Sequence, residues 1–286
     1  MQETMFINLR ERKIGESIEI LFPDWEAGCE RLAVFGAHDD DPLLGAGYAM
    51  AAAAKNGAEL FVVILCKGDC GYSSPEQKET IVETRRLENV NALVKFGVPR
   101  ENIVRFEYPD FSLGNFIGNK LNNGDDGTFL KMVDFIRQNG ITRVLIPNGY
   151  REHVDHTAAY EMGVYDIIQA GDPVVSDRGN MQLVKSTLQY SVWADFSPED
   201  ALVTGEQDIM IRANKAILSP QETEDRVCEA ISEYASQAQI INNLVASRKE
   251  RFTGQGYIEL YIDMDPRPKL DFAPYVKLIQ GLIDNH

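Results

Sequence analysis

The sequence predicts an α/β fold of the Rossmann-like type, in which helices cover both faces of a mainly parallel sheet. Short apolar runs alternate with segments of helical periodicity between about residues 30 and 170. Each helical segment is long enough to cross between parallel strands. The 286 residues contain no internal repeat and no low-complexity segment. We therefore expect one domain over 1–286, with a core at about 30–170 and a helical and strand extension at about 171–286 that completes it.

The individual elements follow from the apolar runs and their boundaries. The run RLAVFGA at 31–37 fits a buried strand, and Pro42 suits the first turn of a helix that ends at Gly57. By the same criteria we predict strands at 58–66, 102–108 and 142–148, and helices at 76–96, 126–139 and 157–170. After Gly171 the pattern changes, and we expect an edge strand at 183–193, a helical stretch at 206–248 and a strand at 256–265.

The charge balance restricts the class of partner. The chain has 28 basic and 44 acidic residues, a net charge of −16, which argues against binding to nucleic acid or to an anionic membrane. The sequence has no long apolar run for a membrane span, and from its first residues we expect no secretory signal. The four cysteines are predicted to be reduced thiols. These features predict a cytoplasmic protein whose partner is a small molecule, with a homo-oligomer left open.

The residues that carry chemistry gather in two short clusters. Three of the four histidines lie in AHDDD (37–41) and REHVDH (151–156). Each cluster follows a predicted strand, and the carboxyl ends of parallel strands meet at one edge of the sheet. A single histidine is more often an ordinary polar residue than a ligand, but here every non-terminal histidine sits among carboxylates. Two imidazoles and a carboxylate suit one Zn²⁺ ion with a coordination position left for water.

A zinc site of this kind predicts a division of work between neighbouring side chains. Asp40 and Asp41 point in different directions in an extended turn, so one can bind the metal while the other takes a proton from water. His153 and His156 are three residues apart and share a face if a helix begins there. One of them can then bind the metal while the other faces a developing oxyanion.

These clusters resemble the PIG-L/LmbE-like family of zinc-dependent N-acetylglucosaminyl deacetylases. That family has A-H-P-D-D-E after its first strand and H-P-D-H after a later one, where this chain has AHDDDP (37–42) and HVDH (153–156). The similarity continues in an R-x-x-E helix within TRRLENVNALVKFGV, in YPDFSL (108–113) and in AISEYASQ (230–237). It thus extends over most of the chain.

The resemblance implies a role for each matching residue. The metal ligands would be His38, Asp41 and His156. Asp40 would be the general base, and His153 would stabilise the oxyanion or protonate the leaving amine. The implied activity is the zinc-dependent removal of an acetyl group from an N-acetylated amino sugar or glycoconjugate.

Three further positions have implied roles around this set. Asp155 would orient a histidine and thereby support catalysis. Arg85 and Asp110 match positions that contact substrate in the family. Arg248 and Arg251, near the end of the resemblance, are expected to serve packing or solvation rather than the pocket.

The chain also departs from the family pattern at three positions. Asp39 and Val154 replace prolines, and Pro42 replaces the glutamate after the two aspartates. A catalytically altered member that binds metal or sugar without turnover is therefore the alternative reading.

Two other classes fit the sequence less well. A nucleotide-dependent oxidoreductase would use Gly45 and Gly47, but Met50 replaces the third glycine and the nearby aspartates repel a pyrophosphate. A non-haem iron site built on His38, Asp40 and His156 belongs to all-β folds, which the βα alternation opposes.

Overall fold

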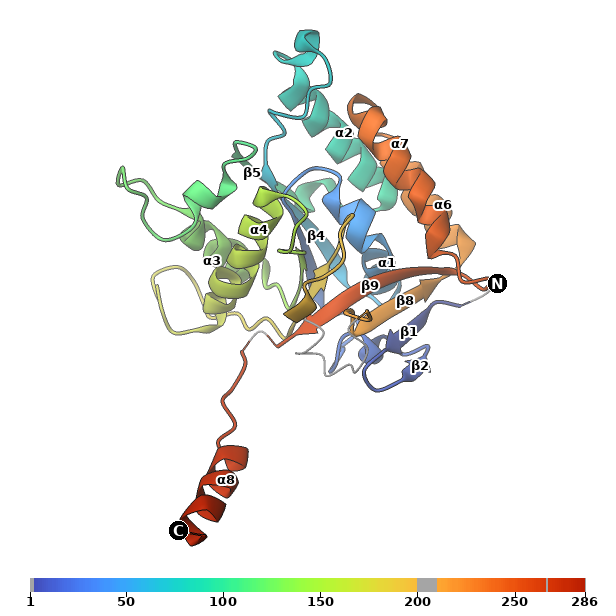
Figure 1. Cartoon of the computed structure of the whole chain (residues 1–286). Helices are drawn as coiled ribbons and strands as arrows, with labels where there is room; N and C mark the ends of the chain where they lie inside the picture. Colours follow the sequence, from blue (N-terminus) through green and yellow to red (C-terminus); the bar gives the residue numbers. More distant parts are fainter. Residues whose placement is uncertain (1–2, 200–209, 266, 286) are drawn as a thin grey trace.

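The computed structural model describes residues 3–199, 210–265 and 267–285. Within these residues one nine-stranded sheet runs through the molecule, in the order β2-β1-β8-β9-β7-β6-β3-β4-β5 (Figure 1). The strands are β1 Met5–Asn8, β2 Lys13–Gly15, β3 Arg31–Gly36, β4 Glu59–Cys66, β5 Ile103–Tyr108, β6 Arg143–Pro147, β7 Ser186–Tyr190, β8 Lys215–Ser219 and β9 Tyr257–Met264.

The sheet has a parallel half and an antiparallel half. Strands β7, β6, β3, β4 and β5 are parallel to one another, whereas β9, β8, β1 and β2 extend the sheet by antiparallel pairing. The inner parallel strands β3, β4 and β6 are nearly continuous apolar runs because both of their faces are covered. The predicted α/β class is confirmed, with a parallel central part of the sheet that antiparallel strands extend on one side.

The sheet separates two hydrophobic cores, and helices cover each of its two faces. The helices are α1 Asp41–Lys55, α2 Ile81–Phe96, α3 Thr128–Asn139, α4 Val154–Glu161, α6 Gln221–Ile231, α7 Ala238–Ser247 and α8 Ala273–Asp284. Alternate residues of each central strand point to opposite faces, so Leu32 and Val34 pack in the core with α1 and α2, while Ala33 and Phe35 pack with α3 and α4.

The structure corrects three of the sequence predictions. Strand β7 is not an edge strand, because it pairs with β6 on one side and β9 on the other. The helical stretch expected at 206–248 is wrong at its start: residues 206–209 lie outside the described residues, and β8 occupies 215–219. Pairing with β1 and β9 holds this short apolar run as a strand, which outweighs its local preference. Helix α4 begins at Val154, earlier than the predicted 157.

A buried ion-pair network joins the C-terminal segment to the start of α1. The Arg248 guanidinium lies 2.6 Å and 2.8 Å from the two carboxylate oxygens of Glu224, and both side chains are buried. Arg248 and Arg251 also donate hydrogen bonds to the carbonyl oxygen of Leu44, in the first turn of α1. The expected packing role is confirmed for Arg248, whereas Arg251 also lines a cavity described below. The network fixes the helix end that carries Asp41.

Two glycines in α1 serve packing. A Cβ at Gly45 would lie 2.4 Å from the ring of Tyr190, and one at Gly47 would lie 2.8 Å from Val227. Their backbone is inside a helix rather than in a phosphate-binding turn, which removes the basis for the oxidoreductase reading. None of the described helices combines the length and apolar character that crossing a bilayer requires.

Candidate active site

The two predicted clusters meet at one edge of the sheet. His38 lies two residues after the end of β3, and Asp41 begins α1. His153 caps the start of α4 in the connection that follows β6. Because β3 and β6 are neighbouring parallel strands, both connections leave the sheet at the same edge, as the sequence predicted.

His38, Asp41 and His156 form a compact group of metal-ligand atoms. One ligand atom from each residue lies within 4.8 Å of the other two. His156 Nε2 is 3.2 Å from Asp41 Oδ1, yet both atoms are buried and neither has a hydrogen-bond partner. Leaving such atoms unsatisfied costs about 1–3 kcal/mol each. Two nitrogen donors and one carboxylate are a donor set that Zn²⁺ accepts, so the residues present fit a divalent metal.

The electrostatics of this group depend on its burial and its opposite charges. Burial alone lowers the pKa of His156, but the carboxylates of Asp41 and Glu152 outweigh it and raise that pKa to about 10. Burial raises the pKa of Asp41, but His156 and His38 outweigh it and lower that pKa to about 2. Without a metal, these shifts favour a charged imidazole beside a carboxylate, in an ion pair whose 3.2 Å contact does not form a hydrogen bond.

Glu152 orients His156 and was not singled out from the sequence. Its Oε2 accepts a hydrogen bond of 2.7 Å from His156 Nδ1, which turns Nε2 toward Asp41. Its Oε1 accepts hydrogen bonds from the backbone N–H groups of Val192, Trp193 and Ala194 at 2.8, 3.1 and 3.0 Å. The signal in the sequence was the spacing of four residues between the glutamate and the histidine.

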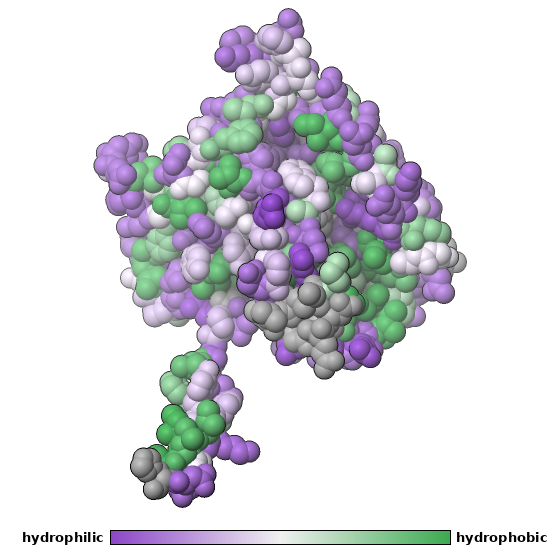
Figure 2. All heavy atoms as spheres, viewed as in Figure 1, coloured by the Kyte–Doolittle hydropathy of each residue, from purple (hydrophilic) through white to green (hydrophobic). Residues whose placement is uncertain are grey.

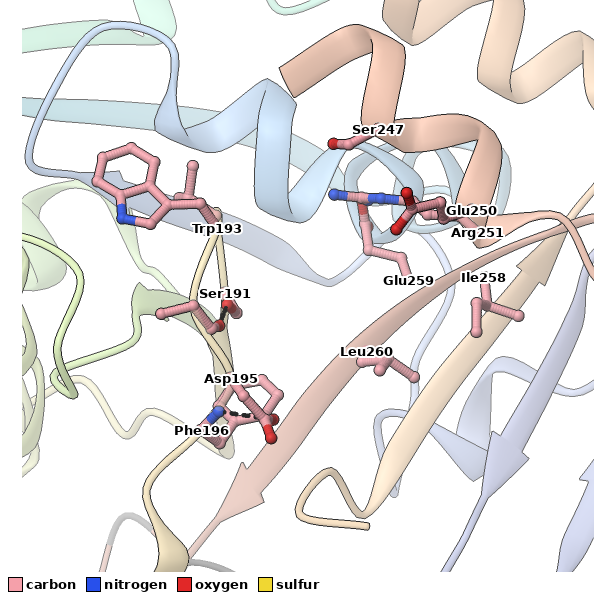
Figure 3. A pocket seen from close by; sticks show the side chains of 12 residues that line it. Ser191, Trp193, Asp195, Phe196, Ser247, Glu250, Arg251, Ile258, Glu259 and Leu260 are labelled. Carbon is pink, nitrogen blue, oxygen red and sulfur yellow. Dashed lines mark hydrogen bonds and ion pairs between the residues drawn. The ribbon is translucent and has the colours of Figure 1, made fainter. Parts of the chain in front are cut away.

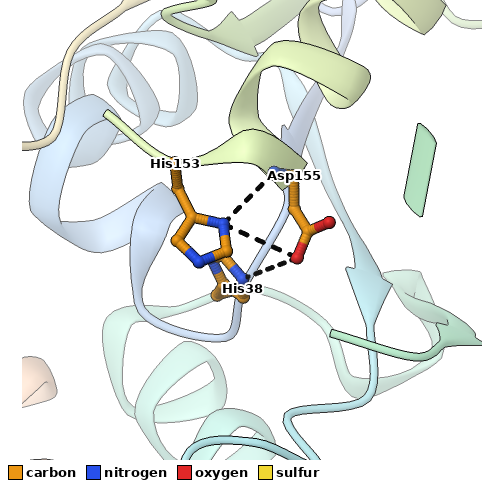
Figure 4. Close-up of side chains that lie close together, drawn as sticks. All are labelled: His38, His153 and Asp155. Carbon is orange, nitrogen blue, oxygen red and sulfur yellow. Dashed lines mark hydrogen bonds and ion pairs between the residues drawn. The ribbon is translucent and has the colours of Figure 1, made fainter. Parts of the chain in front are cut away.

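Asp155 lies between two histidines (Figure 4) and also supports a neighbouring loop. Its Oδ2 lies 3.4 Å from His38 Nε2 and 3.6 Å from His153 Nδ1. The same carboxylate accepts hydrogen bonds from the N–H groups of Phe111 and Leu113 at 2.6 and 3.1 Å. His38 is thereby held with Nδ1 on the side of Asp41, 3.7 Å from its Oδ2.

His153 and Asp40 complete the group. The His153 ring is partly exposed, its centroid is 4.6 Å from that of His38, and its Nδ1 accepts a hydrogen bond from the N–H of Asp155. Burial and the charge of His38 lower the pKa of His153. Burial and the charge of Asp41 raise the pKa of Asp40, whose Oδ1 lies 3.6 Å from Arg85 Nη2.

Asp39, which stands where the family has proline, forms a buried ion-pair cluster. Arg85 Nε lies 2.9 Å from Asp39 Oδ2, and Arg105 Nη1 pairs with Asp39 Oδ1. The Asp39 carbonyl accepts hydrogen bonds from Asn89 at 2.8 Å and from the Tyr234 hydroxyl at 2.7 Å. The extra negative charge is therefore matched by two guanidinium groups beneath the site.

The two predicted substrate contacts lie close to the site but have partners inside the protein. Arg85 is buried and engaged by Asp39, with its side chain against Gly68 and Gly71. Asp110 accepts hydrogen bonds from the N–H groups of Gly68 and Cys70 at 2.9 and 3.0 Å. Their contact with substrate stays a prediction.

A cavity opens on the side of Trp193 (Figure 3). It has a volume of about 340 Å³ and is lined by Trp193, Arg251, Glu259 and Leu260 among others. The Trp193 ring centroid is 5.1 Å from that of His156. The segment that Glu152 holds therefore borders both the histidine group and the cavity.

The fold and the site together define a class: an α/β protein with a histidine and carboxylate centre at the carboxyl ends of parallel strands. Residues 33–166 match the PIG-L family, described as GlcNAc-PI de-N-acetylase. These residues are a PIG-L family domain, and the resemblance drawn from the sequence is confirmed.

Solved structures share this fold over most of the chain. N,N'-diacetylchitobiose deacetylase from Pyrococcus horikoshii is 15% identical with a TM-score of 0.63, covering 87% of this chain and 90% of its own. 4-Carboxy-2-hydroxymuconate hydratase from Pseudomonas putida KT2440 is 20% identical with a TM-score of 0.61, covering 85% and 100%. The zinc-inhibited form of teicoplanin deacetylase Orf2 is 18% identical with a TM-score of 0.51, covering 82% and 99%. No curated protein sequence matches the chain significantly.

Proposed function

We propose that the protein is a zinc-dependent hydrolase that removes the acetyl group from an N-acetylated amino sugar or glycoconjugate. The observation that carries the proposal is the buried pair of unsatisfied atoms, Asp41 Oδ1 and His156 Nε2, beside His38. A structural histidine cluster would satisfy these atoms internally. The PIG-L family domain and the deacetylases that share the fold support the reaction class.

His38, Asp41 and His156 would hold the metal through Nδ1, a carboxylate oxygen and Nε2. When bound, a divalent metal supplies Lewis-acid polarisation of the acetamide carbonyl and makes water more acidic. Asp155 fixes His38, and Glu152 fixes His156, so that each ring presents the required nitrogen.

Asp40 is the group that accepts the proton of the attacking water. Its raised pKa keeps it a stronger base than a solvated aspartate, which suits proton transfer near neutral pH. His153 has a lowered pKa and accepts at Nδ1, so it is neutral with a proton on Nε2. That N–H donates to the developing oxyanion, and its proton can pass to the leaving amine. The products are acetate and the free amine.

The charge around the site favours a neutral sugar over a tricarboxylic acid of the kind named for the hydratase that shares the fold. Asp39, Asp40 and Asp41 are consecutive, and Arg85 and Arg105 are already paired with Asp39. No unpaired cation is left among these residues for a substrate carboxylate. We place the rest of the substrate over Trp193 and in the adjoining cavity, since an aromatic face beside polar groups suits a sugar ring.

The test combines metal content with acetate release from a panel of N-acetyl amino sugars. The expected result is one metal ion per chain and turnover of at least one N-acetylated compound. Asp40→Asn should keep the metal and lower kcat by about 10²–10⁴-fold, as expected for loss of a general base. Asp125→Asn, in an exposed loop, is the matched control and should keep full activity.

Two results would overturn the proposal. Near-normal turnover by Asp40→Asn would remove the general base. Bound metal and bound sugar without acetate release would instead support the alternative, a metal- or sugar-binding member without turnover.

A further inference from the structure

Helix α8 stands away from the rest of the chain (Figure 1). It spans Ala273–Asp284, and no residue in it is buried. Its local hydrogen bonds are its own, such as Val276 N–H to the Phe272 carbonyl at 2.9 Å. An isolated helix of this length is marginal in water, because such helices depend on packing of an apolar face. The helix therefore needs a surface that the single chain does not provide.

The apolar residues of this segment lie along one side of the helix. They recur at steps of three and four residues, and each is between 50% and 67% exposed. They are Phe272, Tyr275, Val276, Leu278, Ile279, Leu282 and Ile283. The other side carries Lys277, Gln280 and Asp284. In Figure 2 the apolar side chains gather on the projecting helix. Spacing of this kind is the pattern by which helices pack against one another.

We infer that α8 is a self-association arm, whose apolar side packs against α8 of a second copy of this chain. At about 100 Å² of exposed surface per side chain, the seven residues offer roughly 700 Å² in one copy and about 1,400 Å² in a pair. Stable protein interfaces bury about 1,200–2,000 Å² in total, so the pair reaches this range when nearly all of its apolar surface is covered. A two-fold axis between the helices lets the same side chains meet in both copies.

The charge distribution favours a second copy over a membrane. Helices that lie on membranes carry a polar side rich in Lys and Arg, whereas α8 has one lysine and one aspartate. The whole chain has a net charge of −16, which opposes approach to an anionic surface. The segment from Arg267 to Asn285 has Arg267, Lys269 and Lys277 against Asp271 and Asp284. Two copies that meet through this segment avoid most of their mutual repulsion.

The segment that precedes α8 is held against the domain at Arg267. Arg267 lies 2.9 Å from the Asp172 carboxylate and donates a hydrogen bond to the Ile168 carbonyl oxygen. This anchor directs the following residues away from the sheet and leaves the apolar side of α8 free to meet another molecule. The inference does not depend on the proposed catalytic function.

The test is the mass of the full-length protein in solution, measured by sedimentation equilibrium from about 1 to 100 µM. We expect the wild-type protein at twice the chain mass of 32.1 kDa. Ile279→Asp places a charge in the paired surface and should weaken association by at least about 100-fold. Gln280→Asp adds the same charge one residue further, on the polar side, and should leave the mass unchanged. Leu282→Asp should repeat the effect of Ile279→Asp.

Three results would overturn the inference. The first is a monomeric wild-type protein across this concentration range, as when α8 folds back onto its own domain. The second is equal association of the Ile279→Asp and Gln280→Asp proteins. The third is a monomer that cosediments with phosphatidylserine-containing vesicles, which would assign the apolar side to lipid. Thermal melting of each variant separates loss of association from loss of folding, since α8 contributes no buried residue to the domain.

Discussion

The Glu152→Gln variant separates the two roles of the Glu152 carboxylate, which orients His156 and accepts hydrogen bonds from the loop at residues 192–194. The three N–H groups of residues 192–194 need an acceptor at Oε1, so they fix the glutamine amide with its oxygen toward them. The amide NH₂ must then face His156 Nδ1, from which the wild-type carboxylate accepts a hydrogen bond. His156 is driven to carry its proton on Nε2, the atom that should bind the metal.

The expected changes in zinc affinity and in stability depend on which of these hydrogen bonds each variant keeps. Loss of such an orienting partner lowers metal affinity by about 10–100-fold, so Glu152→Gln should bind zinc that much more weakly. Its melting temperature without metal should stay close to wild type, because the loop keeps its acceptor. Glu152→Ala leaves three N–H groups without an acceptor, at about 1–3 kcal/mol each, and should lose both metal affinity and stability.

The assay is competition with a chromogenic chelator for zinc, together with thermal melting of the metal-free proteins. Wild-type zinc affinity in Glu152→Gln would refute the reasoning. So would an equal loss of stability in both variants, because the glutamine would then not serve the loop.

Three further predictions follow from the same contacts. Because His156 has a pKa of about 10 without metal, zinc must displace its proton when it binds. The affinity for zinc should therefore rise about tenfold per pH unit below that pKa. Calorimetry in two buffers should detect at least one proton released per zinc ion bound. A pH-independent affinity between 6 and 8 would contradict this. Arg248→Met leaves the Glu224 carboxylate buried and unpaired and should lower the free energy of unfolding by about 3–5 kcal/mol in urea titration; no change would show that the network is not structural. Trp193→Ala should raise KM more than it lowers kcat, and the reverse split would place Trp193 in the chemical step.

The sequence was most informative where chemistry and local pattern coincide. The apolar runs of β3, β4 and β6 can be recognised directly because both faces of these strands are buried, and the clusters of His38 and His156 follow two of them. Adjacent parallel strands force their connections to one edge, so the convergence of the histidines could be predicted without coordinates.

The parts that sequence could not supply depend on contacts between distant segments. The strand at 215–219 is held by β1 and β9, and nothing local distinguishes it from the helical pattern around it. The pairing of Asp39 with Arg85 and Arg105 joins residues 46 and 66 positions apart, so the reason for an aspartate in place of proline was hidden. Glu152 acts partly on backbone N–H groups near residue 193, which carry no sequence signal.

The measurement closest to the central claim is an anomalous difference map from crystals of the purified protein, collected on both sides of the zinc absorption edge. We expect one peak per chain, within bonding distance of His38 Nδ1, an Asp41 carboxylate oxygen and His156 Nε2, that disappears in His156→Ala. A fully loaded peak elsewhere in the molecule, or crystals grown with zinc that show none between these side chains, would contradict the assignment of this centre.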